Sequence, residues 1–130
     1  MKKELTIKNK NPNSFSVKAR LKSFRYAFEG LNNFFSAQHN AIIHLLMTFA
    51  VVFAAIFFNV NRGEAIAIIL AAGFVWAAEF FNTAIEKLAD IVSKEFHPGI
   101  KFIKDVSAAA VLLSAITAVL VGAIIFLPKF

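Results

Sequence analysis

The sequence predicts an all-α integral membrane protein, with an N-terminal amphipathic surface helix followed by three transmembrane helices. Hydrophobic residues make up 58% of the 130-residue chain. The mean hydropathy is +0.67, which is too high for an ordinary soluble domain of this length. Three separate apolar runs are each long enough to cross about 30 Å of hydrocarbon. The length allows one domain.

Residues 1–14 are polar and are expected to form a flexible N-terminus. A helix is expected over residues 15–36, because apolar side chains recur there at steps of three and four and so share one helical face. That face comprises Val17, Leu21, Phe24, Phe28, Leu31 and Phe35. Such a helix can lie in the membrane interface, with its basic side toward the headgroups, or pack against other helices of the protein. The pattern allows both.

The three membrane-spanning segments are expected at residues 41–60, 64–90 and 105–127, within a single membrane domain over residues 15–130. The only titratable group in the first segment is His44, near its cytoplasmic end. Small polar side chains suited to helix packing in the third segment are Ser107, Ser114 and Thr117.

Basic residues are distributed unevenly along the chain. Eight of the fourteen Lys and Arg residues precede the first apolar run, and four lie between the second and third runs. This asymmetry places the N-terminus in the cytoplasm together with a polar loop over residues 92–100, which we expect to be broken at Pro98-Gly99. It places the C-terminus outside. Because no nucleic-acid-binding motif accompanies the charge, no nucleic-acid partner is expected. The chain has no Cys, which excludes disulfides and thiolate metal sites.

The most informative stretch is residues 79–90, which continues without a break from the second apolar run. At 100° per residue, Glu79, Glu86 and Asp90 fall within roughly 60° of one another on a helix, with Asn82 beside them. Carboxylates at membrane depth are costly and need partners in a protein interior or a wet cavity. Since three helices enclose such a stripe poorly, we expect a homo-oligomer that buries it between subunits.

The residues alone leave more than one interpretation of this stripe open. The carboxylates could hold Mg²⁺ together with substrate phosphates and supply a general base. They could instead pair with Lys87, Lys101 or Lys104 and hold the helices together. A path for ions or protons is a third interpretation, disfavoured because the acidic groups occupy only the inner half of one helix.

Lys104 and Asp105 are expected at the start of the third segment, and they too allow a functional and a structural interpretation. The lysine could meet a nucleotide phosphate, with the aspartate orienting it, or Asp105 could simply favour the dipole at a helix N-terminus. The chain contains neither G-x-x-x-x-G-K-[ST] nor G-x-G-x-x-G, so a nucleotide site would be neither a P-loop nor a protein-kinase site.

Several segments resemble one known family. Residues 79–90 resemble the E-x-x-N-[ST]-A-I-E-x-x-x-D signature of the prokaryotic diacylglycerol kinases, and residues 104–111 resemble the K-D-x-x-[SA]-A-A-V start of that family's last helix. Residues 23–31 look like its surface-helix segment. Residues 40–44 are closer to the undecaprenol-kinase branch. The resemblance covers roughly residues 20–127.

This resemblance implies a homotrimer in the bacterial inner membrane, with composite sites between subunits. It implies ATP- and Mg²⁺-dependent phosphorylation of a membrane lipid alcohol at the cytoplasmic face. Diacylglycerol, which would become phosphatidic acid, is the first expected substrate. Undecaprenol is the alternative.

The resemblance also implies roles for individual residues. By position, Glu79 matches the general base, Asn82 a neighbouring polar contact, and Glu86 a magnesium ligand that also lies near the nucleotide. The other nucleotide-binding matches are Tyr26, Glu95, His97, Lys104 and Asp105, and Asp90 belongs to the surrounding polar network. Gln38 stands where the family usually has a second metal-ligand glutamate, so the expected metal site includes an uncharged ligand.

Overall fold

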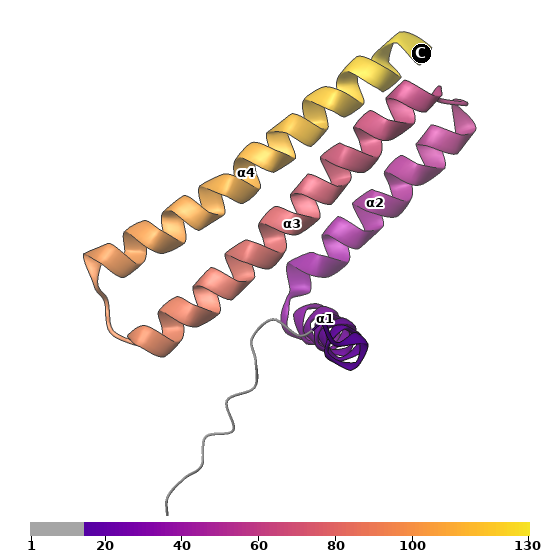
Figure 1. The fold of residues 1–130 in the computed structure, drawn as a ribbon. Helices are drawn as coiled ribbons and strands as arrows, with labels where there is room; N and C mark the ends of the chain where they lie inside the picture. Colours follow the sequence, from indigo (N-terminus) through magenta and orange to yellow (C-terminus); the bar gives the residue numbers. More distant parts are fainter. Residues whose placement is uncertain (1–14) are drawn as a thin grey trace, which may run out of the picture. The chain divides into compact units, whose positions relative to one another are not determined.

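The structure, a computed structural model, describes residues 15–130, and this part of the chain is helical (Figure 1). Its elements are α1 (Val17–Ala37), α2 (His39–Phe57), α3 (Arg62–Val92), α4 (Pro98–Phe126) and the short 3-10 turn η1 (Leu127–Lys129). Three of them, α2, α3 and α4 with η1, are long and apolar enough to cross a membrane. The predicted all-helical chain with three such segments is confirmed. The flexible segment expected at residues 1–14 lies outside the described residues.

Helix α1 crosses the boundary between two compact units, the first ending at Asn33 and the second being Phe34–Phe130. In the first unit, the apolar side chains of Leu21, Phe24 and Phe28 are exposed. Arg25 and Glu29 form an ion pair at 2.8 Å one turn apart. A helix was predicted here, and its place at the membrane surface stays a prediction.

In the second unit, α3 lies between α2 and α4 in an up-and-down arrangement (Figure 1). α3 packs along α4, and α2 touches α3 more sparsely. The side chains buried between helices are mostly small, among them Ala41, Ala89, Ser107 and Ser114. Small residues let helix backbones approach closely.

Large apolar side chains point outward along all three membrane-length helices. Phe53, Phe81 and Val119 are each about 70% exposed. A single chain therefore leaves most of its apolar surface uncovered, as expected of a protein surrounded by lipid or by further subunits.

The turn between α2 and α3 is held by a capping box. Asn59 adopts a positive φ of 49°, which asparagine tolerates better than most residues. The Asn61 side chain accepts a hydrogen bond from the Glu64 backbone N–H, and the Glu64 carboxylate accepts one from the Asn61 backbone N–H. Each group satisfies an N–H that the start of a helix leaves unpaired.

The turn between α3 and α4 is shorter than the sequence predicts. α4 begins at Pro98, seven residues before the expected start at 105, so Pro98-Gly99 starts a helix rather than breaking a loop. Proline suits the first helical position, because its fixed φ is helical and its missing N–H has no helical partner to lose. His97 caps this end by accepting a hydrogen bond from the Gly99 backbone N–H at 3.1 Å. A Cβ at Gly99 would lie 3.2 Å from the His97 ring, so glycine permits this close cap.

Candidate active site

Glu79 lies within α3 and forms an ion pair with α2. His44 Nε2 is 2.7 Å from Glu79 Oε1, and the two side chains are 25% and 13% exposed, respectively. Within residues 15–130, no other hydrogen bond reaches this carboxylate. Glu79 is therefore a sheltered carboxylate with one oxygen engaged and one oxygen available.

An aromatic cluster meets the Glu79–His44 pair through Trp76. Trp76, one turn before Glu79, lies 6.0 Å from the His44 ring between centroids. Its indole N–H donates to Thr48 Oγ1 at 3.0 Å, and the Thr48 hydroxyl donates to the His44 carbonyl at 2.7 Å. At the C-terminal end of α1, Phe34 packs against Phe80, with ring centroids 4.1 Å apart and the rings tilted by 40°.

A second polar group links α3 to α4 through Asn82. The Asn82 amide Nδ2 donates to Glu86 Oε1 at 3.2 Å, and the hydroxyl of buried Ser107 lies 2.7 Å from Asn82 Oδ1. Since an ionised carboxylate can only accept, the Asn82 amide nitrogen faces Glu86 and the amide oxygen faces Ser107. The single Ser107 proton is shared between Asn82 Oδ1 and the Lys104 carbonyl, which is 2.9 Å from the hydroxyl. A serine on α4 thus contacts the asparagine that holds Glu86.

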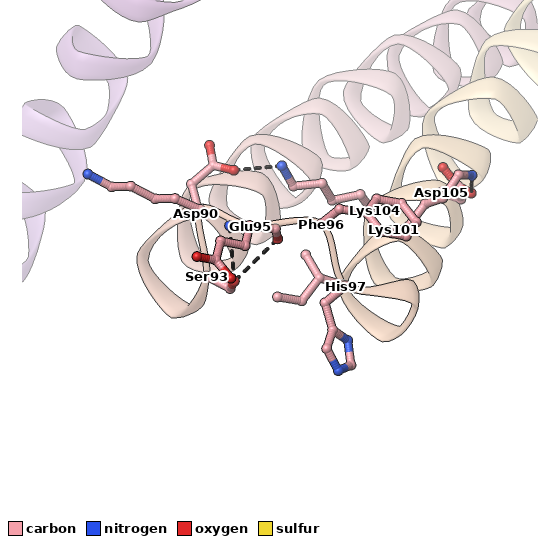
Figure 2. A pocket seen from close by; sticks show the side chains of 10 residues that line it. Asp90, Ser93, Glu95, Phe96, His97, Lys101, Lys104 and Asp105 are labelled. Atoms are coloured by element: carbon pink, nitrogen blue, oxygen red, sulfur yellow. Dashed lines mark hydrogen bonds and ion pairs between the residues drawn. The ribbon is translucent and has the colours of Figure 1, made fainter.

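The turn between α3 and α4 forms an open hollow of about 650 Å³. Its lining includes the predicted residues Asp90, Glu95, His97, Lys104 and Asp105. Figure 2 shows Asp90 and Lys104 pointing toward one another from α3 and α4; Lys104 Nζ is 2.6 Å from Asp90 Oδ1. Lys101 pairs with Asp105 one turn along α4.

The structure divides the predicted stripe into two parts. Asp90 pairs with Lys104, as the ion-pair interpretation expects. Glu79 and Glu86 contact an imidazole and an amide instead. The seven residues between them correspond to roughly 10 Å along the helix axis.

Two predicted site residues stand apart from these contacts. Gln38 is the N-cap of α2, and its side chain makes no capping hydrogen bond. Tyr26 belongs to the first unit, where it is exposed and Lys22 Nζ lies 5.8 Å from the centroid of its ring.

Across residues 15–130, no group of three or more His, Asp or Glu side chains is arranged to hold a metal. Mg²⁺ often takes only one or two protein carboxylates and completes its shell with phosphates and water. Glu86, oriented by Asn82, is suited to that kind of partial site.

Sequence reasoning missed three polar partners. These are His44 beside Glu79, Thr48 beside Trp76, and Ser107 beside Asn82. His44 could have been found, because ionisable groups in apolar segments tend to pair with one another and it is the only one in the first apolar run.

Comparison with known proteins shows which family the chain is similar to. The family model for prokaryotic diacylglycerol kinase matches residues 25–126, a range that contains every predicted site residue. A diacylglycerol kinase of Synechocystis sp. (strain ATCC 27184 / PCC 6803 / Kazusa) is 38% identical over 109 residues, which cover 83% of this chain and 62% of that protein. The undecaprenol kinase of Bacillus subtilis (strain 168) is 32% identical over 108 residues, covering 83% of this chain and 88% of that protein. The chain therefore spans less than two thirds of the Synechocystis relative.

Proposed function

Since this chain belongs to the prokaryotic diacylglycerol kinase family, we propose that it is an ATP-dependent lipid kinase that phosphorylates a membrane lipid alcohol. The observation that carries this proposal is the position of Glu79, a sheltered carboxylate with one oxygen available on an apolar helix. The same helix ends at a hollow lined by lysines. A base at membrane depth and a basic hollow at the helix end suit a lipid acceptor and a phosphate donor, respectively.

The hollow suits the nucleotide. Its volume of about 650 Å³ lies in the range of small-molecule sites, and Lys94, Lys101 and Lys104 offset the charge of a polyphosphate. An ammonium group has three N–H donors, so Lys104 can keep its hydrogen bond to Asp90 and still donate to a phosphate oxygen. Glu95, His97 and Asp105, which line the same hollow, complete the proposed contacts there. A nucleotide contact of Tyr26, in the first unit, is proposed from the family resemblance alone.

Glu79 supplies the proton acceptor. In the proposed reaction, the lipid hydroxyl loses its proton to Glu79 as its oxygen forms a bond to the γ-phosphorus of ATP. The bond from that phosphorus to the β–γ bridging oxygen breaks, and ADP leaves with the electron pair. One carboxylate oxygen is engaged by His44, so the second oxygen is the proposed acceptor.

Glu86 and Gln38 are the proposed protein ligands of Mg²⁺, one charged and one neutral. When bound, the ion would offset charge on the phosphates. Asn82 orients the Glu86 carboxylate and Ser107 contacts Asn82, so α4 would support this ligand indirectly.

The proposed setting is the bacterial inner membrane, with the N-terminus in the cytoplasm and the C-terminus outside. The crowding of basic residues before α2 and around the α3–α4 turn supports this orientation. The large apolar side chains exposed along α2, α3 and α4 support assembly into a homotrimer, in which neighbouring subunits would cover part of that surface.

Diacylglycerol is the proposed acceptor, supported by the more identical of the two named relatives. Undecaprenol is the second candidate, for a specific reason: residues 40–44 resemble the undecaprenol-kinase branch, and this segment contains His44, the partner of Glu79. The Bacillus relative also matches over more of its own length.

A lipid panel tests this proposal. The full chain in mixed micelles, with radiolabelled ATP and Mg²⁺, is given diacylglycerol or undecaprenol, and labelled lipid phosphate is counted. We expect phosphatidic acid to form faster than undecaprenyl phosphate, and a reversed order would establish the second candidate. A Glu79→Gln protein in the same micelles serves as the control. Label in none of the lipid alcohols would contradict a lipid kinase.

A further inference from the structure

His44 is distinguished from the other two histidines by its contact. His97 accepts a backbone hydrogen bond as a helix cap, and His39 is exposed as the first residue of α2. His44 instead contacts the sheltered carboxylate of Glu79 at 2.7 Å. Since an ionised carboxylate only accepts hydrogen bonds, Nε2 of His44 carries the proton between them.

The imidazole is itself held in place. Thr48 donates to the His44 carbonyl and accepts from the Trp76 indole N–H, which ties one turn of α2 to α3. The Trp76 ring lies edge-on to the imidazole. His44 is therefore fixed on one side by Glu79 and on another by Trp76.

We propose that His44 is a positioning residue for phosphoryl transfer, an inference that rests on the proposed role of Glu79 as the base. By donating from Nε2 to Oε1, His44 holds the carboxylate in one orientation. Oε2 then remains as the oxygen that receives the lipid proton. A base held by a third group is a recurring arrangement in enzymes that activate hydroxyl nucleophiles.

A half-buried histidine can have either of two roles. If His44 only satisfies a sheltered carboxylate, its removal changes stability and leaves the turnover of folded protein intact. If it positions the base, its removal lowers kcat at unchanged affinity for ATP. A donor that is not an imidazole should then restore activity.

Substitutions at His44 test the inference in micelles with ATP, Mg²⁺ and the preferred lipid. His44→Leu and His44→Phe both remove the donor, and the phenyl ring preserves packing against Trp76. We expect kcat to fall about 10- to 100-fold, the rate equivalent of one hydrogen bond to a charged group, with the KM for ATP unchanged. His44→Gln, whose side-chain amide can donate, should recover most of the loss. His39→Leu, the same kind of change at the exposed start of α2, should behave as wild type.

Glu79 variants distinguish failure of this inference from failure of the proposed function. In a Glu79→Gln background, His44→Leu should cause no further loss, because the two side chains act as one unit. Wild-type kcat in folded His44→Phe protein, alongside inactive Glu79→Gln protein, would overturn the positioning role and leave the kinase proposal standing. An active Glu79→Gln protein would instead overturn the proposed base. Equal losses in the Gln and Phe variants would also contradict a role that depends on an N–H donor.

Discussion

The start and the second half of α3 both carry carboxylates with polar partners, but these carboxylates are engaged to different extents. At the start of the helix, Glu64 accepts from the Asn61 backbone N–H at 2.8 Å, and Lys129 Nζ lies 3.1 Å from both carboxylate oxygens. In the second half, and within residues 15–130, Glu79 has His44 as its one partner and Glu86 has the Asn82 amide. Both regions contain acidic groups on the same helix. Among the described residues, only the carboxylates of the second region keep an oxygen without a partner.

The difference indicates how to separate a structural carboxylate from a catalytic one. Glu64 uses both oxygens to close a turn and to join α3 to the C-terminal 3-10 turn, so each of its oxygens has a partner. Glu79 is more sheltered but less saturated. Sheltered carboxylates with spare acceptor capacity are the ones expected to accept protons or metals.

The largest expected effect is at Glu79. Glu79→Gln keeps the size of the side chain and its ability to bond His44, and removes the proton acceptor. We expect kcat to fall by about 10² to 10⁴, the usual worth of a general base. Turnover of labelled ATP into lipid phosphate is the measurement. Near-normal turnover in this variant would show that the unpartnered oxygen of Glu79 is not the proton acceptor.

Glu86 tests the second unsaturated carboxylate. Removing an outer partner of a metal ligand typically costs about 10- to 100-fold, so Glu86→Ala should raise half-saturation by Mg²⁺ at least that far or abolish activity. A magnesium titration at fixed ATP measures the shift. An unchanged curve would place the metal elsewhere and leave Glu86 as a partner of Asn82 alone.

The lysines at the two ends form a matched pair. Lys104 bonds Asp90 beside the hollow, and Lys129 bonds Glu64 at the opposite end of α3. Lys104→Met should raise the KM for ATP by about 10-fold, because one hydrogen bond from a charged group to phosphate is lost. Lys129→Met should leave the KM unchanged. Equal KM values in both variants would remove Lys104 from the nucleotide site.

Much of this architecture could be predicted from the sequence, because it depends on local patterns. Apolar runs predict the membrane-length helices, and a 100° period places Glu79, Glu86 and Asp90 on one side of α3. The start of α4 was missed, because Pro98-Gly99 has the composition of a loop although proline fits the first turn of a helix.

The partners of the polar residues could not be predicted in the same way. An arc of roughly 60° on a helix is wide enough to meet two neighbours. The structure shows that Glu79 faces α2 through His44, and that Asp90 faces α4 through Lys104. Which neighbour each side chain meets depends on the rotation and register of packed helices, and these are set by contacts such as that of Ser107 with Asn82.

The smallest expected effect on activity is at Glu64. Glu64→Gln removes the negative charge that Lys129 neutralises, and it keeps an amide oxygen that can still accept from the Asn61 backbone N–H. We therefore expect kcat and the KM for ATP to stay at wild-type values, with a small drop in thermal stability measured by circular dichroism in detergent. Glu64→Ala should lower stability further, since it also removes the reciprocal capping bond. Loss of turnover in folded Glu64→Gln protein would mean that Glu64 contributes to catalysis although both of its oxygens have partners. An oxygen without a partner would then not distinguish the catalytic carboxylates of α3 from the structural one.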